Sequence, residues 1–208
     1  MKPARATGWR LVGTAMAIAG FALAAGAEDA RPVFAEEFDS ASLAPPWRAR
    51  QGLWKVTAGV ATGRKDPASV HPAKLDLLLP QCDGTLQFSF QTDQPGGVDL
   101  FFNRGDLRVA VVQLRPEGLA FATYPKTKAV PSTPTYLARS ERGLAAGAWH
   151  AVRIERRGAT LRVQADSGAS LDVTGTGLED ETTTWMFNLR GPPEMAFSID
   201  HVRVSSPP

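Results

Sequence analysis

The stretch that decides the fold is WHAVRIERRGATLRVQAD, residues 149–166. In its second half, Leu161, Val163 and Ala165 alternate with polar side chains. Successive side chains of a β-strand point to opposite faces, so this alternation predicts a strand with one apolar and one polar face. The pair Arg157-Gly158 separates it from an earlier run of the same kind, which is typical of a hairpin turn. The stretch therefore indicates two antiparallel strands.

The same signals recur from residue 28 onward, with almost no helical periodicity. We expect strands over Val33–Phe38, Leu53–Thr57, Val60–Gly63, Leu75–Leu79, Thr85–Thr92, Val98–Asn103, Leu107–Leu114, Leu119–Tyr124, Trp149–Arg156, Thr160–Asp166, Ser170–Val173, Thr183–Arg190 and Met195–Val204. Many short strands at this spacing predict an all-β sandwich of two antiparallel sheets. The proline-rich and glycine-rich stretch from Pro125 to Ala148 is expected to be a long surface loop with room for a short strand or a helical turn.

The amino terminus is typical of an export signal. Three basic residues precede an apolar run from Leu11 to Ala25, and small residues follow up to Ala27. We therefore expect residues 1–27 to be a secretory signal peptide and residues 28–208 to form one domain that is periplasmic or secreted. No later segment is long and apolar enough to anchor the chain in a membrane.

The charge balance argues against nucleic acid as a partner. Three of the 23 Lys and Arg residues lie in the expected signal peptide, which leaves 20 against 21 Asp and Glu. The remaining basic residues are scattered along the chain rather than clustered. A single cysteine, Cys82, also excludes an intramolecular disulfide.

Four segments resemble the concanavalin A-like lectin/glucanase (laminin G-like) superfamily, most closely its secreted bacterial branch of 3-keto-disaccharide hydrolase domains. They are PVFAEEFDS (32–40), WRARQGLWKVTAGVATG (47–63), AWHAVRIERRGATLRVQAD (148–166) and FSIDHVRV (197–204). The resemblance implies a jelly-roll sandwich whose concave sheet presents polar and aromatic residues to glycans. It therefore implies an oligosaccharide or polysaccharide as the partner.

The sequence offers no catalytic residue. Superfamily members that cleave β-glucans carry acids spaced E-x-D-x-x-E on one strand, and this motif is absent here. In PGGVDLFFNRGDLRVAVVQL (95–114), which resembles the 3-keto-disaccharide branch, Ala110 or Val111 stands where a glutamate is expected. The three histidines also lack the spacing of a metal site.

We therefore interpret the chain as an exported carbohydrate-binding protein without a recognisable acid pair. The first alternative is a glycosidase or lyase of the 3-keto-disaccharide hydrolase type. The second is an adhesion or structural module of the laminin G kind. A catalyst needs titratable groups that converge in a cleft, whereas an adhesion module needs a flat apolar face.

Polar residues alternate with apolar ones along three of the expected strands, beside the start of the long loop. If these strands are neighbours in the concave sheet, six side chains converge: Asn103, Arg108, Gln113, Tyr124, Asn188 and Arg190. The arginines would bind sugar hydroxyls or the carboxylate of an acidic sugar, the amides would fix orientation, and Tyr124 would stack on a ring.

The resemblance also implies a structural calcium ion. In relatives with a similar last strand, the aspartate that matches Asp200 holds calcium together with carbonyl groups from the start of the chain. The alternative is a surface aspartate that caps a strand bulge. No other cofactor is expected.

Overall fold

The computed structural model describes residues 31–81, 83–125, 133–179 and 182–207. Their regular elements are fifteen β-strands in two antiparallel sheets, which confirms the predicted all-β sandwich. The expected signal peptide and Cys82 lie outside these residues, as does the part of the long loop from 126 to 132. The described part of the chain contains no helix with the length and hydrophobicity that a membrane crossing requires.

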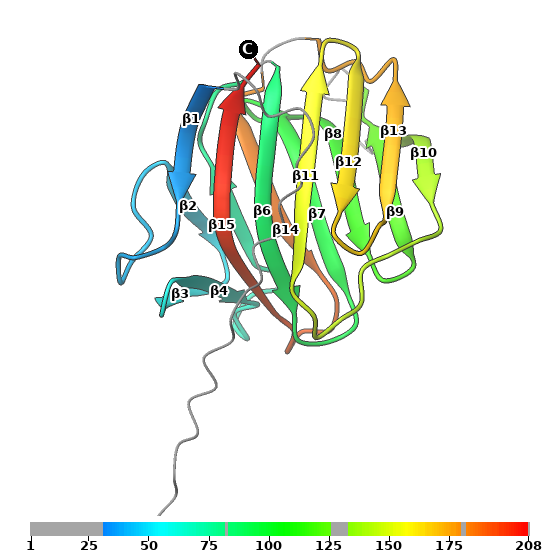
Figure 1. Ribbon diagram of the computed structural model, residues 1–208. Helices are drawn as coiled ribbons and strands as arrows, with labels where there is room; N and C mark the ends of the chain where they lie inside the picture. Colours follow the sequence, from blue (N-terminus) through cyan, green and yellow to red (C-terminus); the bar gives the residue numbers. More distant parts are fainter. Residues whose placement is uncertain (1–30, 82, 126–132, 180–181, 208) are drawn as a thin grey trace, which may run out of the picture.

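The first sheet has eight strands. Its order is β13 (Ser170–Thr174), β12 (Thr160–Ala165), β11 (His150–Arg157), β6 (Gly84–Thr92), β15 (Ala196–Ser206), β4 (Val60–Arg64) and β3 (Leu53–Thr57), and β1 (Arg31–Glu36) pairs with β15. Figure 1 shows most of this sheet in front, with β1 and β15 side by side although they come from opposite ends of the chain.

The second sheet has seven strands and lies behind the first in Figure 1. Its order is β10 (Thr135–Ser140), β9 (Gly118–Thr123), β8 (Leu107–Arg115), β7 (Gly97–Arg104), β14 (Thr184–Arg190), β5 (Lys74–Leu77) and β2 (Trp47–Gln51). The two central strands, β7 and β14, are thus far apart in sequence but paired in space.

The hydrophobic core fills the space between the sheets. Leu86, Phe88 and Phe90 of β6 are all buried there, as their alternation predicts. Phe88 meets Phe187 of β14 edge to face, with 5.2 Å between ring centroids, so side chains of the two sheets interdigitate.

Two strands are absent from the sequence-based expectation. They are β2 and β10, the outermost strands of the seven-stranded sheet. An edge strand has a neighbour on one side only and carries much exposed polar surface, so the apolar periodicity that reveals central strands is weak. Within the segment from Pro125 to Ala148, for which we expect a long loop with room for a short strand, β10 is that strand.

The centre of the seven-stranded sheet differs from strands such as β12, in which exposed and buried residues alternate. Strands β7, β9 and β14 are buried on both faces over nearly their whole length. On the outer face, away from the core, a second apolar cluster is formed by Phe101, Val111, Ala122 and Met186. Long side chains from neighbouring positions lie across this cluster, as described below.

Candidate functional site

The outer face of the seven-stranded sheet holds all six side chains that the sequence singles out. Asn188 pairs with Asp99 across β14 and β7, and Asp99 pairs with Gln113 across β7 and β8. Asn103 pairs with Arg108 beyond a bulge in the β7–β8 ladder. The order of the strands therefore supplies the neighbourhood that the sequence prediction assumed.

The six side chains differ in how they meet solvent. Asn103 and Asn188 are only 4% and 3% exposed, so a ligand does not reach them without displacing their neighbours. Gln113 and Tyr124 are half-buried, whereas Arg108 and Arg190 are exposed. The accessible part of the predicted site is thus two guanidinium groups, one amide and one phenol.

The apolar cluster is the floor of this face. Tyr124 packs against it, with its ring centroid 6.1 Å from that of Phe101. The guanidinium carbon of Arg108 lies 4.6 Å above the centre of the same Phe101 ring. Stacking of this kind keeps a guanidinium flat against the aromatic surface while its N–H groups remain available at the edge.

Asp99 is the most buried charge of the central strands and has two arginine partners. The Nε of Arg190 donates to Asp99 Oδ2 at 2.6 Å, and Nη2 of Arg115 donates to Asp99 Oδ1. Gly97 lies beside this group, and a Cβ placed there would lie 2.8 Å from Cδ of Arg115. The glycine thus leaves the space in which the Arg115 side chain reaches Asp99.

A second acid with arginine partners lies near the β2 edge, and the sequence did not reveal it. Asp76 of β5 is fully buried, and it accepts hydrogen bonds from Nη2 and Nε of Arg48 at 2.6 and 3.1 Å. Arg50 approaches the same carboxylate to 3.8 Å. These residues come from a strand that the sequence did not predict and from its neighbour in the sheet.

The β10 edge adds an aromatic residue and another cation. The hydroxyl of Tyr136 donates to Oε1 of Gln113 at 3.2 Å, so it reaches one of the six predicted residues. The guanidinium carbon of Arg139 lies 4.1 Å above the Tyr136 ring. Neither was predicted as a site residue, because no strand bounds were assigned within this long loop and its sequence carries no periodicity that assigns a face.

Lys74 and Tyr124 have shifted pKa values on this face. Burial lowers the pKa of the Lys74 ammonium, and the positive charges of Arg108, Arg50 and Arg190 lower it further while Asp76 opposes them. Burial also raises the pKa of the Tyr124 phenol, with Arg108 opposing the shift. The face therefore combines incomplete hydration with an excess of positive charge.

The two buried carboxylates of this face are not arranged as a hydrolytic pair. Asp76 and Asp99 lie two strands apart and are offset by two residues along the sheet. Standard strand spacings place their Cα atoms about 12 Å apart. Glycosidases hold their two carboxyl groups about 5–5.5 Å apart when they retain configuration and about 6.5–9.5 Å apart when they invert it. Each acid is also occupied by arginine.

A pocket of about 210 Å³ adjoins this face at the end of β14. Arg190 belongs to both, because it lines the pocket and binds Asp99. The other residues that line the pocket are mainly apolar and include Val70, Leu189 and Met195.

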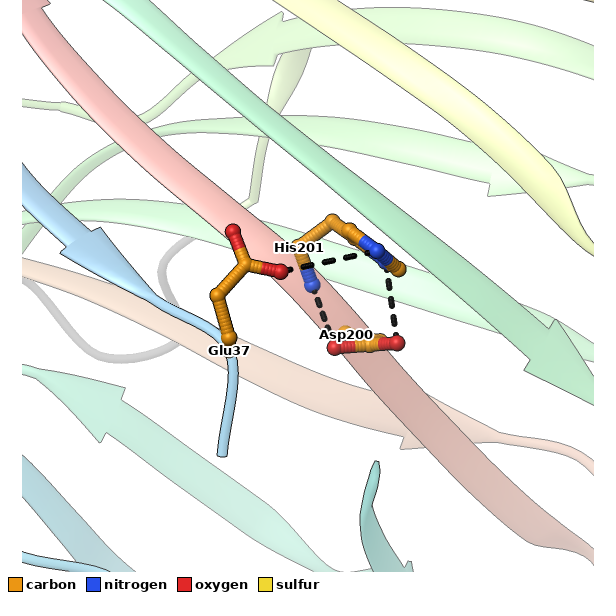
Figure 2. A group of neighbouring side chains, drawn as sticks. All are labelled: Glu37, Asp200 and His201. Carbon is orange, nitrogen blue, oxygen red and sulfur yellow. Dashed lines mark hydrogen bonds and ion pairs between the residues drawn. The ribbon is translucent and has the colours of Figure 1, made fainter. Parts of the chain in front are cut away.

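The predicted metal residue, Asp200, lies in the other sheet, next to Glu37 and His201 (Figure 2). Nδ1 of His201 is 2.9 Å from Asp200 Oδ2, and its Nε2 is 3.5 Å from Glu37 Oε2. A bulge in β15 leaves His201 and its neighbour opposite a single residue of β6, with His201 in the left-handed region at φ 50°. Burial raises the pKa of Asp200, and the negative charge of Glu37 adds to the shift.

The donor chemistry of this cluster fits a calcium ion in part. Two carboxylates supply the oxygen ligands that calcium prefers, whereas the imidazole nitrogen between them is typical of transition-metal sites. Nη2 of Arg203 also donates to Glu37 Oε1 at 3.1 Å. Asp200 and Glu37 are therefore the residues that would hold calcium.

Comparison with known proteins identifies the architecture. No protein-family model matches the chain, and no curated protein is similar to it in sequence. Among solved structures, the laminarinase of Rhodothermus marinus superposes with a TM-score of 0.64 over 86% of this chain and 98% of that one, at 12% identity. The protein is a concanavalin A-like jelly roll. Its two packed antiparallel sheets with the hydrophobic core between them agree with this fold.

Two further solved structures are similar to this chain over most of its length. One is a non-specific endo-β-1,3(4)-glucanase from family GH16, with a TM-score of 0.62 and 12% identity over 86% of this chain and 92% of that one. The other is the carbohydrate-binding module CBM66 from Bacillus subtilis, with a TM-score of 0.56 and 14% identity over 77% and 95%. At these identities the likeness establishes the fold, while the 3-keto-disaccharide branch remains a prediction from sequence.

Proposed function

We propose that this jelly roll binds carbohydrate on the outer face of its seven-stranded sheet. The observation that carries the proposal is the composition of that face, an aromatic and aliphatic floor bordered by arginine, tyrosine and glutamine side chains. Sugar rings present apolar C–H faces that stack on aromatic groups, and their hydroxyls need directional polar partners. The accessible groups of the face supply both kinds of contact.

The named neighbours support this proposal. They include glucanases and a carbohydrate-binding module, so the same architecture serves glycan recognition with and without hydrolysis. Binding without hydrolysis agrees better with the wide separation of Asp76 and Asp99 and with their arginine partners. A laminin G-like adhesion role would need a flat apolar face, and cationic side chains lie across this one.

A glycan array of the chain from residue 28 onward tests this function. We expect binding to a defined set of glycans, and each hit is then incubated with the protein and analysed for shortened or unsaturated products. Appearance of such products would replace the binding function with the glycosidase or lyase alternative. Absence of any hit, both on the array and among the hexasaccharides tested below, would reject carbohydrate binding.

Two variants locate the binding face. Tyr124→Ala removes a stacking surface, and Arg108→Ala removes hydrogen bonds that each contribute on the order of 1 kcal/mol, or about fivefold in affinity. We expect each variant to weaken glycan binding while its melting temperature stays close to that of the wild type. Unchanged binding in the double variant would place the site elsewhere, with the segment from Pro125 to Ala148 as the next region to test.

A further inference from the structure

Positive charge dominates the outer face of the seven-stranded sheet. On the described strands, seven cationic side chains face outward here against two carboxylates, Asp76 and Asp99. The cations are Arg48, Arg50, Lys74, Arg108, Arg115, Arg139 and Arg190. The imbalance is local, because the chain without its expected signal peptide is close to neutral.

The two carboxylates are occupied by some of these cations. Arg115 and Arg190 share Asp99, and Arg48 and Arg50 approach Asp76. Among the described residues, no carboxylate lies within ion-pair distance of Lys74, Arg108 or Arg139. Three cations around the apolar floor are therefore free to meet a charged ligand.

The position of Lys74 is unfavourable for its charge in the unliganded protein. Its side chain is half-buried on β5 between β2 and β14, and the charges of Arg108, Arg50 and Arg190 act on it against the opposing charge of Asp76 alone. Like charges in a partly dehydrated setting repel more strongly than they do in water. An anion placed among these groups would relieve the repulsion, whereas a neutral ligand would not.

Resting on the carbohydrate-binding function proposed above, we infer that the ligand of this face is an anionic glycan whose sugars carry carboxylate or sulfate groups. The apolar floor and Tyr124 receive the ring faces, while Lys74, Arg108 and Arg139 receive the anions. The bonds of Asp99 with Arg115 and Arg190 show that this surface already holds a carboxylate between two guanidinium groups.

Matched pairs of ligands test the inference by calorimetry. The panel contains hexagalacturonate, its methyl ester, hexamannuronate, a chondroitin sulfate hexasaccharide and laminarihexaose, which is neutral. We expect at least one anionic hexasaccharide to bind and laminarihexaose not to bind. For a carboxylated ligand, esterification should abolish binding, and preferential binding of the sulfated ligand would identify sulfate as the group recognised. Raising the salt concentration from 50 to 500 mM should weaken anionic binding at least tenfold, since salt screens exposed charges.

Variants that remove one charge each connect the binding to the proposed face. Lys74→Met and Arg108→Gln should each weaken binding of the anionic hexasaccharide about tenfold, which corresponds to 1.4 kcal/mol. The matched control is Arg162→Gln, because Arg162 is an exposed strand arginine in the other sheet, paired with Asp172. The control should bind as the wild type does, and all variants are first shown to melt cooperatively.

The outcomes separate this inference from the proposed function. If laminarihexaose binds with higher affinity than every anionic ligand, and Tyr124→Ala weakens that binding, the proposed class of anionic ligands is wrong. Carbohydrate binding itself would then stand. If anionic ligands bind but Lys74→Met and Arg108→Gln leave their affinity unchanged, the inference also fails, because other residues then bind the anionic groups. If neither this panel nor the wider array yields a ligand, both proposals are rejected.

Discussion

Asp99 links the stability of the domain to its candidate binding face. It is 1% exposed, and its two oxygens are held by Arg115 and Arg190. Arg190→Ala should destabilise the domain by about 1–2 kcal/mol, because a buried carboxylate loses one of two partners and the lost partner is itself half in water. For a domain of this size that corresponds to a melting temperature about 2–8 °C lower. Differential scanning calorimetry measures it.

The control for this first prediction is Arg108→Ala. Arg108 lies over Phe101 and has no carboxylate partner among the described residues, so its loss should leave the melting temperature within a degree or so of the wild type's. Equal melting temperatures for the two variants would contradict the role given to Asp99. Arg190 is consequently a poor residue for locating the glycan site, since its loss changes binding and folding together.

Lys74 gives a prediction about pH. Its pKa is lower in the folded than in the unfolded chain, so between the folded value and about 10.4 the unfolded chain binds more protons. The contribution of Lys74 to the free energy of unfolding therefore rises with pH through that window. Lys74→Met should be more stable than the wild type at neutral pH, and this advantage should shrink as the pH approaches 10.4. Denaturant unfolding at several pH values measures it, and parallel pH profiles would refute it.

At the scale of single elements, strand β7 requires a glycine at its first position. A Cβ at Gly97 would lie 2.2 Å from the carbonyl oxygen of Leu114 in β8, and that oxygen belongs to the backbone and cannot move aside. Gly97→Ala should therefore destabilise the domain by about 2–3 kcal/mol, as overpacking does. Urea unfolding measures the change.

The comparison variant for Gly97 is Gly105→Ala, in the turn after β7. Gly105 has a positive φ of 58°, but nothing lies within 4 Å of its added Cβ. Only backbone strain of about 1 kcal/mol is expected there. If Gly105→Ala were the more damaging change, close packing between β7 and β8 would not be what Gly97 serves.

The bulge in β15 carries the proposed calcium site. We propose that Asp200 and Glu37 hold a structural calcium ion, supported by the convergence of their carboxylates. Calcium should raise the melting temperature of the wild type and a chelator should lower it, while Asp200→Ala should respond to neither. The same melting experiment with zinc in place of calcium tests whether the imidazole nitrogen of His201 is a metal ligand. A melting temperature that is indifferent to calcium and chelator in both proteins would reject the site.

Local periodicity was enough to predict most strands but not their partners. Leu86, Phe88 and Phe90 alternate strictly because one face of β6 packs on the core. The edge strands β2 and β10 lack this constraint, and so Arg48 and Tyr136 were not recognised. Lys74 was missed for another reason. Its environment is set by arginines on three other strands, and the order of strands in a sheet cannot be predicted from local sequence.

The prediction of the six site residues needed only the alternation of faces and one assumption about neighbouring strands. Both Asn103 and Asn188 are on the expected face. Their burial was not predictable, because the large side chains that cover this face come from several strands. Sequence thus indicates which way a side chain points, whereas its exposure depends on what the other strands bring across it.

At the scale of the whole molecule, we propose that the protein is exported. The basic and apolar pattern of residues 1–27 predicts cleavage after Ala27. Mass spectrometry of the periplasmic or secreted protein should therefore find an amino terminus at Glu28. A soluble cytoplasmic form that retains Met1 would rule out this processing.

The pairing of β1 with β15 has a consequence for how the molecule is made. β15 contains the last strand residues of the chain, yet it stands inside the eight-stranded sheet and holds β1, β4 and β6 together. Until residues 196–206 have left the ribosome, those three strands lack the neighbour that joins them. Most residue contacts in this fold join parts of the chain that are far apart in sequence, as β1 and β15 do. Such long-range contacts slow folding. The eight-stranded sheet therefore cannot be completed before residues 196–206 are available to pair with β1, β4 and β6.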